Sequence, residues 1–308
     1  MLNSMCIGVV GAGLMGHGIA QVFLEDGRFD VCVYDAAPGL IETVQERIAS
    51  NLKTLGRPAV SFAKLKLSDD IGEALSGCQI VFEAVPEKLE IKHHVMRQIE
   101  AVVSGECIIA SNTSVIPIGH IGEAISKKDR LVGTHWWNPP FLIPLVEVVQ
   151  ATATNQQVVE RTISLLESVG KVAVHVKKDV PGFVGNRLQH ALWREAIALV
   201  SQGICDARTV DLVVKNSFGL RLPVLGPLEN ADLVGLDLTQ DIHAVILPTL
   251  DSTSWPNRIV TNSVRDGNLG MKSGKGFYEW TYSSAQGVRE QLLAYLAAAL
   301  KERSDAQT

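Results

Sequence analysis

The sequence of 308 residues lacks the features that mark several classes of protein. It contains no run of about 18 apolar residues, so no transmembrane helix is predicted. Its first residues include neither a basic region nor a cleavage site, so no secretion signal is predicted. The 28 Lys and Arg and the 33 Asp and Glu residues are interspersed, and no cluster of one sign indicates a nucleic acid or a membrane surface as partner. We therefore expect a cytoplasmic protein whose partners are small molecules.

Cysteine is scarce and scattered. The five cysteines are odd in number, widely spaced and mostly placed inside apolar runs, which favours reduced thiols over disulfides and predicts a reducing compartment. No His, Cys, Asp or Glu residues recur at the spacing of metal ligands, and the adjacent pair His93-His94 does not form such a pattern. We expect no bound metal.

The residues that are present suit a large core and two domains. Hydrophobic residues make up 46% of the chain, and its length favours more than one domain. In the first half, continuous apolar strands alternate with helical stretches, which predicts a parallel sheet covered on both faces. After Pro181-Gly182 the strand patterns stop. The predicted fold is therefore α/β, with a Rossmann-type doubly wound sheet domain over 1–181 followed by an all-α C-terminal domain over 182–308. Strands are predicted at 5–10, 29–35, 77–87, 106–114, 130–140 and 144–150, and helices at 13–27, 88–103, 156–169, 183–202, 207–217, 228–248 and 286–302.

The segment GAGLMG follows the first predicted strand and opens the first helix. Gly11, Gly13 and Gly16 match the GxGxxG pattern, and Asp35 ends the second strand 19 residues later. In this pattern the first glycine allows a tight turn, the second lets the backbone approach a pyrophosphate, and the third lets helix and strand pack closely. Asp35 would accept hydrogen bonds from the adenosine ribose and repel a 2′-phosphate, so NAD is predicted rather than NADP. The predicted cofactor loop includes Leu14 and Met15.

Polar residues follow or interrupt three later strands. The segment SNTS at 111–114 comes directly after CIIA, at the edge where a parallel sheet binds ligands, although such residues are also common in turns and helix caps. Glu147 lies in the apolar segment PLVEVVQ, where an unpaired carboxylate would be costly to bury. His135 is the nearest plausible partner. We predict a dyad in which Glu147 holds one imidazole nitrogen and the other nitrogen acts as general base.

With these segments the chain resembles the L-3-hydroxyacyl-CoA dehydrogenase family over nearly its full length. The motifs are GAGLMGHGIA, FEAVPE, SNTS, H--NP followed by PLVEVV, PGFVGNRL, GPLENADLVGLD and KSGKGFYEW. The resemblance implies an NAD-dependent dehydrogenase that moves a hydride from the β-carbinol of a hydroxy acid, or of its thioester, to the nicotinamide. It implies that Ser114 hydrogen-bonds the substrate hydroxyl, that His135 removes its proton, that Glu147 orients His135, and that Asn186 helps to hold the substrate oxygen. It also implies that the cofactor is lined by Ala84, Glu87, Lys92 and Asn112.

Other roles stay open for three of these residues. Ser114 could cap a helix after Pro117, and Asn186 could cap the helix after Pro181-Gly182. Lys92 lies in an amphipathic helix and could be solvated. The alternative to an enzyme is a structural protein that binds NAD without turnover, as the lens crystallins of the family suggest.

Departures from the family pattern bear on the substrate. Family members that act on CoA thioesters usually show HFFNP and a longer basic hairpin, whereas this chain has HWWNPP and scattered basic residues over 38–70. The chain is similar to branches that act on free hydroxy acids, such as L-gulonate 3-dehydrogenase, L-carnitine dehydrogenase and a pyridine-carboxylate dehydrogenase. We expect a small free hydroxy acid, with L-3-hydroxyacyl-CoA as the alternative. Its carboxylate would be held by one or more of Ser114, Asn186 and Arg187, in a pocket narrowed by Trp136, Trp137, Pro139 and Pro140.

The second domain carries an expectation about assembly. Residues 183–202 and 228–248 are apolar on more than one helical face, which exceeds what a small helical domain needs for its own core. Family members typically dimerise through this domain. We therefore expect a two-fold homodimer.

Overall fold

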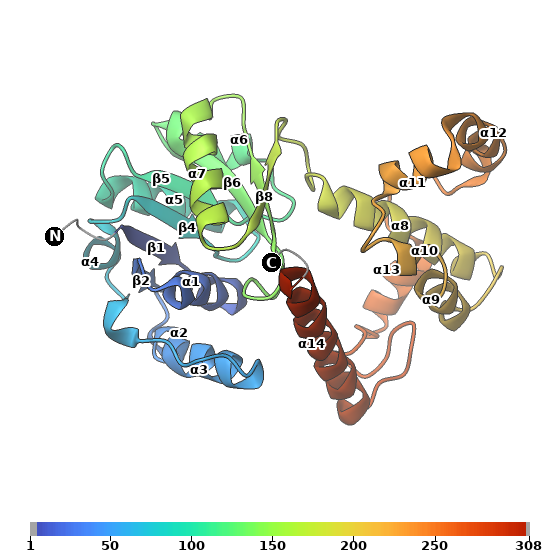
Figure 1. Ribbon diagram of the computed structural model, residues 1–308, viewed down its shortest axis with the longest axis horizontal. Helices are drawn as coiled ribbons and strands as arrows, with labels where there is room; N and C mark the ends of the chain where they lie inside the picture. The colour runs from blue at the N-terminus through green and yellow to red at the C-terminus, as the bar shows by residue number, and fades with distance from the viewer. Residues whose placement is uncertain (1–4, 306–308) are drawn as a thin grey trace. The chain divides into compact units, whose positions relative to one another are not determined.

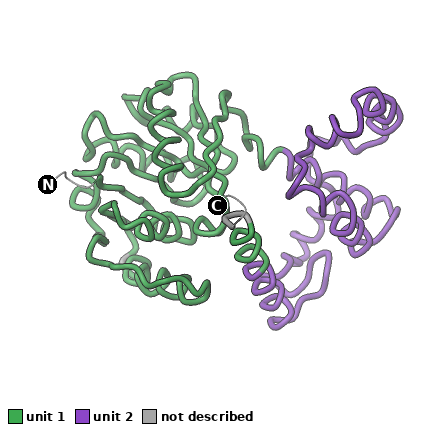
Figure 2. The backbone as a smooth tube through the Cα atoms, in the orientation of Figure 1, with its two compact units in different colours: residues 1–187, 295–308 green, residues 188–294 purple. Residues whose placement is uncertain are grey.

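The computed structural model describes residues 5–305 (Figure 1). The chain forms two compact units, coloured separately in Figure 2. Unit 1 comprises the residues up to Arg187 together with those from Tyr295 onward, and unit 2 comprises Leu188–Ala294. Within residues 5–305, no helix has both the length and the apolar character that crossing a membrane requires.

Unit 1 is built on an eight-stranded sheet with the order β3-β2-β1-β4-β5-β6-β7-β8. The predicted sheet is confirmed, but it is not wholly parallel, because β7 runs antiparallel to β6. Only residues 137–144 join these two strands, and a parallel pair needs a crossover of a dozen residues or more. Two strands that the sequence did not predict, β3 and β8, form the edges. The strands are β1 Cys6–Val10, β2 Asp30–Tyr34, β3 Leu65–Ser68, β4 Ile80–Glu83, β5 Ile108–Ser111, β6 Leu131–Trp136, β7 Leu145–Val149 and β8 Val172–Val176.

Helices cover both faces of the sheet, as a doubly wound fold requires. On one face, α1, α3 and α7 pack on side chains such as Val9 and Phe82, whereas on the other face α4, α5 and α6 pack on Val10 and Val81. Neighbouring strand residues thus enter opposite cores, since side chains alternate along a strand. The helices of this unit are α1 Leu14–Asp26, α2 Pro38–Ile41, α3 Val44–Thr54, α4 Ile71–Leu75, α5 Leu89–Val102, α6 Ile118–Ile121 and α7 Gln156–Ser168.

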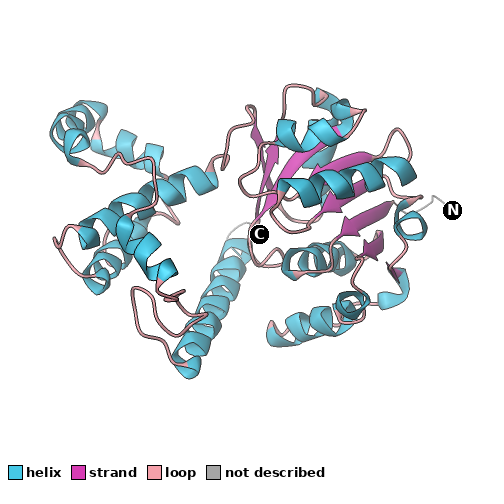
Figure 3. Ribbon diagram, turned by 180° about the vertical axis from the view of Figure 1, so that it is seen from behind, coloured by secondary structure: helices cyan, strands magenta, loops and turns pink. Residues whose placement is uncertain are grey.

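The rest of the chain forms helices joined by loops (Figure 3). The helix predicted over 228–248 is interrupted at Gly235, whose φ of 102° ends one helix and begins the next. Within Leu188–Ala294, only Ala198 and Ala285 are buried. Unit 2 therefore has almost no core of its own. Its helices, the first and last of which extend beyond its bounds, are α8 Gly185–Ser201, α9 Ala207–Lys215, α10 Phe218–Arg221, α11 Pro227–Val234, α12 Leu236–Ile246, α13 Arg258–Arg265 and α14 Tyr282–Asp305.

Candidate active site

The three glycines of the GxGxxG pattern, which spans the loop after β1 and the start of α1, have different surroundings. Gly11 has a φ of 101°, and a Cβ placed there would lie 2.8 Å from the carbonyl oxygen of Ala84. A Cβ on Gly16 would lie 1.6 Å from the carbonyl oxygen of Gly11, so only glycine lets α1 approach the loop. A Cβ on Gly13 would meet no atom within 4 Å. Gly13 is also the N-cap of α1, and open space at a helix N-terminus fits a pyrophosphate.

Asp35 lies beside this loop and helps to shape it. Its Oδ2 accepts a hydrogen bond of 2.8 Å from the Ala12 backbone N–H, and its Oδ1 accepts one of 2.8 Å from the Ala37 N–H. Each oxygen retains a second lone pair for a ribose hydroxyl. Arg47, which the sequence did not single out, donates from its guanidinium to the carbonyl oxygen of Ala12 at 2.7 Å.

The other predicted residues of this region differ in exposure. Leu14 is exposed, whereas Met15 packs partly buried against the core. A cavity of about 460 Å³ opens here and is lined in part by Gly13, Leu14 and Arg47. The loop therefore offers a nucleotide both polar backbone groups and an exposed apolar side chain.

Glu87 holds the loop that follows β5. Its Oε1 accepts hydrogen bonds from the Thr113 hydroxyl at 2.6 Å and from the backbone N–H groups of Ser114 and Val115 at 2.9 and 3.0 Å. Burial raises the pKa of Glu87, but these hydrogen bonds and the Lys92 charge outweigh it, so the pKa lies below its ordinary value. The carboxylate thereby fixes the backbone of the SNTS segment.

Lys92 is fully buried behind Glu87, so it is not a solvated residue of α5. Its Nζ lies 2.8 Å from Glu83 Oε1 and 3.3 Å from Glu87 Oε2. Glu83 Oε2 accepts a hydrogen bond of 2.5 Å from the Ser111 hydroxyl. The sequence analysis did not identify Glu83. This glutamate directly follows the apolar residues IVF and is, like Glu147, a carboxylate in an apolar segment that needs a partner.

Asn112 joins the ends of two strands. It is buried, and its Oδ1 accepts a hydrogen bond of 3.0 Å from the Trp136 backbone N–H. The side-chain amide nitrogen keeps its donors for another partner.

His135 and Glu147 face each other across β6 and β7 as register partners. His135 Nδ1 lies 2.8 Å from Glu147 Oε2, and both side chains are buried, with exposures of 4% and 1%. Glu147 Oε1 accepts hydrogen bonds from the backbone N–H groups of Val184 and Gly185 at 2.9 and 3.0 Å. Burial raises the pKa of Glu147, but the bonds from His135, Gly185 and Val184 outweigh it and hold the pKa below its ordinary value.

Two aromatic rings enclose the imidazole. The ring centroids of Trp137 and Phe183 lie 5.1 and 5.7 Å from that of His135. Its Nε2 makes no hydrogen bond to any residue within 5–305. A Cβ on Gly185 would lie 2.4 Å from Trp137 Cζ2, so glycine lets the start of α8 approach both Trp137 and Glu147.

Trp136 does not line the pocket, contrary to the prediction. It is buried against Phe23 and Phe82, at centroid distances of 6.4 and 5.7 Å, in the core on the other face of the sheet. Alternation along β6 sends Trp136 and His135 to opposite faces. Trp137 lies beyond the end of the strand, and its ring remains beside His135.

Ser114 and Asn186 are hydrogen-bonded to each other rather than capping helices. The Asn186 side-chain amide donates to the Ser114 carbonyl oxygen at 2.9 Å, and Asn186 lies inside α8. The N-cap of α6 is Pro117, and the side chain that bonds to that helix terminus is Asp179, whose Oδ2 accepts a hydrogen bond of 2.8 Å from the Gly119 backbone N–H. Arg187 is exposed and donates to the Pro181 carbonyl oxygen at 3.4 Å.

Comparison with known proteins identifies related enzymes. The NAD binding domain of 3-hydroxyacyl-CoA dehydrogenase matches residues 6–180, and the C-terminal domain of the same family matches residues 182–280. A crystal structure of 5-formyl-3-hydroxy-2-methylpyridine 4-carboxylic acid 5-dehydrogenase, described as an NAD⁺-dependent dismutase, is similar with a TM-score of 0.90. It is 35% identical, and the match covers 96% of this chain and 97% of that one.

Curated relatives include enzymes for free acids and for CoA thioesters. The 5-formyl-3-hydroxy-2-methylpyridine 4-carboxylate 5-dehydrogenase of Mesorhizobium japonicum is 36% identical over 297 residues, which cover 95% of this chain and 96% of the relative. The probable 3-hydroxybutyryl-CoA dehydrogenase of Deinococcus radiodurans is 34% identical, covering 90% and 100%. The L-carnitine dehydrogenase of Streptomyces coelicolor is 35% identical, covering 76% and 74%. This chain therefore belongs to the 3-hydroxyacyl-CoA dehydrogenase family and is an NAD-dependent oxidoreductase that acts on a hydroxyl group.

Proposed function

We propose that this enzyme oxidises the β-hydroxyl group of a small free hydroxy carboxylic acid to a ketone, with His135 as the general base. The observation that carries the proposal is the buried hydrogen bond of 2.8 Å between His135 Nδ1 and Glu147 Oε2. A carboxylate at Nδ1 selects the tautomer whose Nε2 carries a lone pair, and that nitrogen can take the proton of a substrate hydroxyl.

Glu147 also stabilises the product of that proton transfer. When Nε2 takes the proton, the imidazole becomes a cation, and the adjacent carboxylate offsets its charge. The carboxylate in turn stays ionised because Val184 and Gly185 donate to its other oxygen. Bound NAD supplies the hydride acceptor. Ser114 and Asn186 are proposed to hold the substrate oxygen, since the amide of Asn186 is already anchored on the Ser114 loop.

The proposed cofactor site follows the loops at the carboxyl ends of β1, β2, β4 and β5. The pyrophosphate would lie over Gly13, and Asp35 would receive the adenosine ribose. Glu87 and Lys92 support the loop after β5 through the contacts described above. The proposed set comprises Gly11, Gly13, Leu14, Met15, Gly16, Asp35, Ala84, Glu87, Lys92 and Asn112.

The ion pairs made by basic residues of the 38–70 region favour a free acid as substrate. A CoA nucleotide normally needs several free Lys or Arg side chains. Here Arg57 pairs with Glu25 at 2.9 Å and Lys66 with Glu73 at 3.0 Å. The names of two relatives, acting on a pyridine carboxylate and on L-carnitine, agree with this choice.

The second candidate substrate is L-3-hydroxybutyryl-CoA, because the match to the probable 3-hydroxybutyryl-CoA dehydrogenase of Deinococcus radiodurans covers the entire length of that relative. Steady-state kinetics with β-hydroxy carboxylates and with L-3-hydroxybutyryl-CoA at low and high salt separates the two. We expect kcat/KM to be greater for some free acid and to change little with salt. A preference for the thioester that weakens with salt, as phosphate contacts do, would replace the first candidate by the second.

We further propose that residues 1–181 act as the NAD-binding domain and residues 182–308 as a helical domain for substrate binding and dimerisation. The near absence of buried residues in Leu188–Ala294 supports a homodimer, because helices with a large exposed apolar surface need a partner to cover it. A second copy of this chain is the proposed partner.

A further inference from the structure

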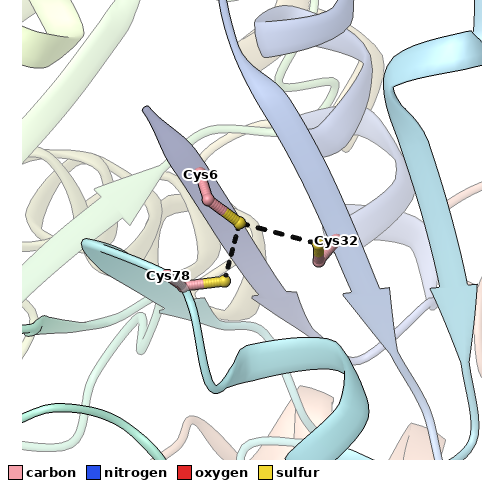
Figure 4. Close-up of side chains that lie close together, drawn as sticks. All are labelled: Cys6, Cys32 and Cys78. Atoms are coloured by element: carbon pink, nitrogen blue, oxygen red, sulfur yellow. Dashed lines mark hydrogen bonds between the residues drawn. The ribbon is translucent and has the colours of Figure 1, made fainter. Parts of the chain in front are cut away.

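Three cysteines that are far apart in the sequence come together at the end of the sheet where β1 begins (Figure 4). Cys6 is the first residue of β1, Cys32 lies within the adjacent β2, and Cys78 lies in the turn before β4, on the other side of β1. Figure 4 shows the three sulfur atoms pointing toward one another. The cofactor loop follows the opposite end of β1.

The distances between the sulfurs suit one common ligand. Cys6 Sγ lies 3.1 Å from Cys78 Sγ and 3.6 Å from Cys32 Sγ, and the three atoms lie within 4.8 Å of one another. Two sulfurs that bind one ion at about 2.3 Å are separated by about 3.8 to 4.0 Å in tetrahedral or trigonal geometry. Side-chain shifts of less than 1 Å would bring the thiols to that spacing.

The fold keeps room for this cluster. A Cβ on Gly8 would lie 3.1 Å from Cys78 Sγ and 2.8 Å from a methyl carbon of Leu75. Glycine at this position therefore leaves the space that the Cys78 thiol occupies beneath α4. Cys32 and Cys78 are buried and Cys6 is half-buried, so an ion could reach the cluster from the Cys6 side.

We propose that Cys6, Cys32 and Cys78 form a binding site for one thiophilic closed-shell ion, Cu(I) or Zn(II), held by three thiolates. Soft thiolate ligands select these ions. Within residues 5–305, no carboxylate or imidazole joins the three sulfurs as a fourth ligand, which favours Cu(I), because structural zinc sites are almost always four-coordinate. Each thiol that binds the ion releases one proton to solvent, and no atom changes its oxidation state.

The sequence did not predict this site, because the ligands come from β1, β2 and the turn before β4 and have no local spacing.

The test is direct metal binding by the reduced full-length protein. The protein is titrated without oxygen with Cu(I) against a chromophoric chelator, and separately with Zn(II). We expect one equivalent of Cu(I) to bind more tightly than Zn(II), and the ion to protect these three cysteines together from alkylation in peptide mass mapping. Cys6→Ser, Cys32→Ser and Cys78→Ser should each weaken binding of the ion. Mutation of a residue that only supports a metal ligand typically weakens binding about 10- to 100-fold, so loss of a ligand should weaken it at least that much. NAD titration checks that the variants fold.

Two variants serve as matched controls. Cys107→Ser alters a buried thiol outside the cluster, and Cys205→Ser alters a half-buried one, so both should bind the ion as the unmodified protein does. Tighter binding of Zn(II) than of Cu(I) would keep the three-thiolate site and change its ion. The proposal would be overturned if neither ion bound, or if the ion did not protect the three cysteines of the unmodified protein from alkylation. It would also be overturned if the protein bound no metal and formed a disulfide between Cys6 and Cys78 after peroxide treatment.

Discussion

At the residue scale, the proposed chemistry depends on the imidazole of His135 and on the groups that hold it. Its Nδ1 is engaged by Glu147 and its ring is enclosed by Trp137 and Phe183. Of its two ring nitrogens, Nε2 is the one that makes no hydrogen bond within the described part of the chain. The imidazole is thus held in one orientation before substrate binds, which is the condition for efficient general base catalysis.

His135→Ala should lower kcat by about 10² to 10⁴, the usual contribution of a positioned general base. Binding of NAD, followed by intrinsic fluorescence, should persist, because the cofactor loop is formed by other residues. His120→Ala, at an exposed imidazole, is the matched control and should retain activity. Near-normal turnover in His135→Ala would refute the assigned base.

Glu147 makes stability depend on pH in a defined direction. Its pKa in the folded protein lies below the ordinary value of 4.5, so the unfolded chain binds the proton more readily. The stabilisation is complete above about pH 4.5 and is lost as the pH falls through the folded pKa. In Glu147→Gln, melting should occur at a lower temperature near neutral pH, and the difference from the unmodified protein should shrink in acid. A difference that does not vary with pH would reduce Glu147 to a packing role.

At the element scale, the two helix starts that border the site depend on glycine for different reasons. Gly13→Ala should weaken NAD binding at least about tenfold and leave the melting temperature nearly unchanged, because its Cβ would meet no protein atom within 4 Å but would enter the space over the N-terminus of α1.

Gly185→Ala should lower both stability and kcat, because its Cβ would collide with Trp137 and displace α8 from Glu147. Calorimetry and cofactor titration distinguish the two patterns, and equal behaviour of both variants would contradict this account.

The loops after β4 and β5 depend on the buried pair of Lys92 and Glu83. Lys92→Met leaves Glu83 as a buried carboxylate without its cation, and loss of one partner of such a pair typically costs about 3–5 kcal/mol. Urea unfolding measures this change in the free energy of unfolding. Lys88→Met, at an exposed lysine just before α5, should change stability by less than about 0.5 kcal/mol. Equal stability of the two variants would show that Lys92 is not essential to the network.

At the scale of the whole molecule, the two units differ in how they bury apolar residues. The core of unit 1 lies on both faces of one sheet, whereas Leu188–Ala294 buries only two alanines. Exposed side chains in this segment include Val224, Leu228 and Trp255, each at 80% or more. A surface of this kind is characteristic of a subunit interface.

The whole molecule should therefore sediment as a homodimer, with twice the mass of one chain, at micromolar concentration. Analytical ultracentrifugation over a range of concentrations measures the mass. Because the interface would supply much of the missing core of unit 2, thermal unfolding should shift to higher temperature as protein concentration rises. A monomer whose melting temperature does not depend on concentration would contradict the proposed dimer.

The sequence by itself determined the family, the NAD cofactor and the doubly wound sheet, because each depends on a short pattern. A glycine loop between a strand and a helix, and apolar runs between amphipathic stretches, can be read without knowing which segments meet. The partner proposed for Glu147 was also predictable, since a carboxylate within an apolar strand needs a nearby donor.

Only the tertiary structure decided which face each side chain occupies and which distant groups meet. It placed Trp136 in the core and left Trp137 beside His135, because strand alternation depends on where β6 ends. It buried Lys92 against Glu83 and brought together three cysteines from β1, β2 and the turn before β4. It also set β7 antiparallel to β6, which makes His135 and Glu147 register partners. Such outcomes depend on strand order and register, which arise from contacts between residues far apart in the chain and leave no local pattern in the sequence.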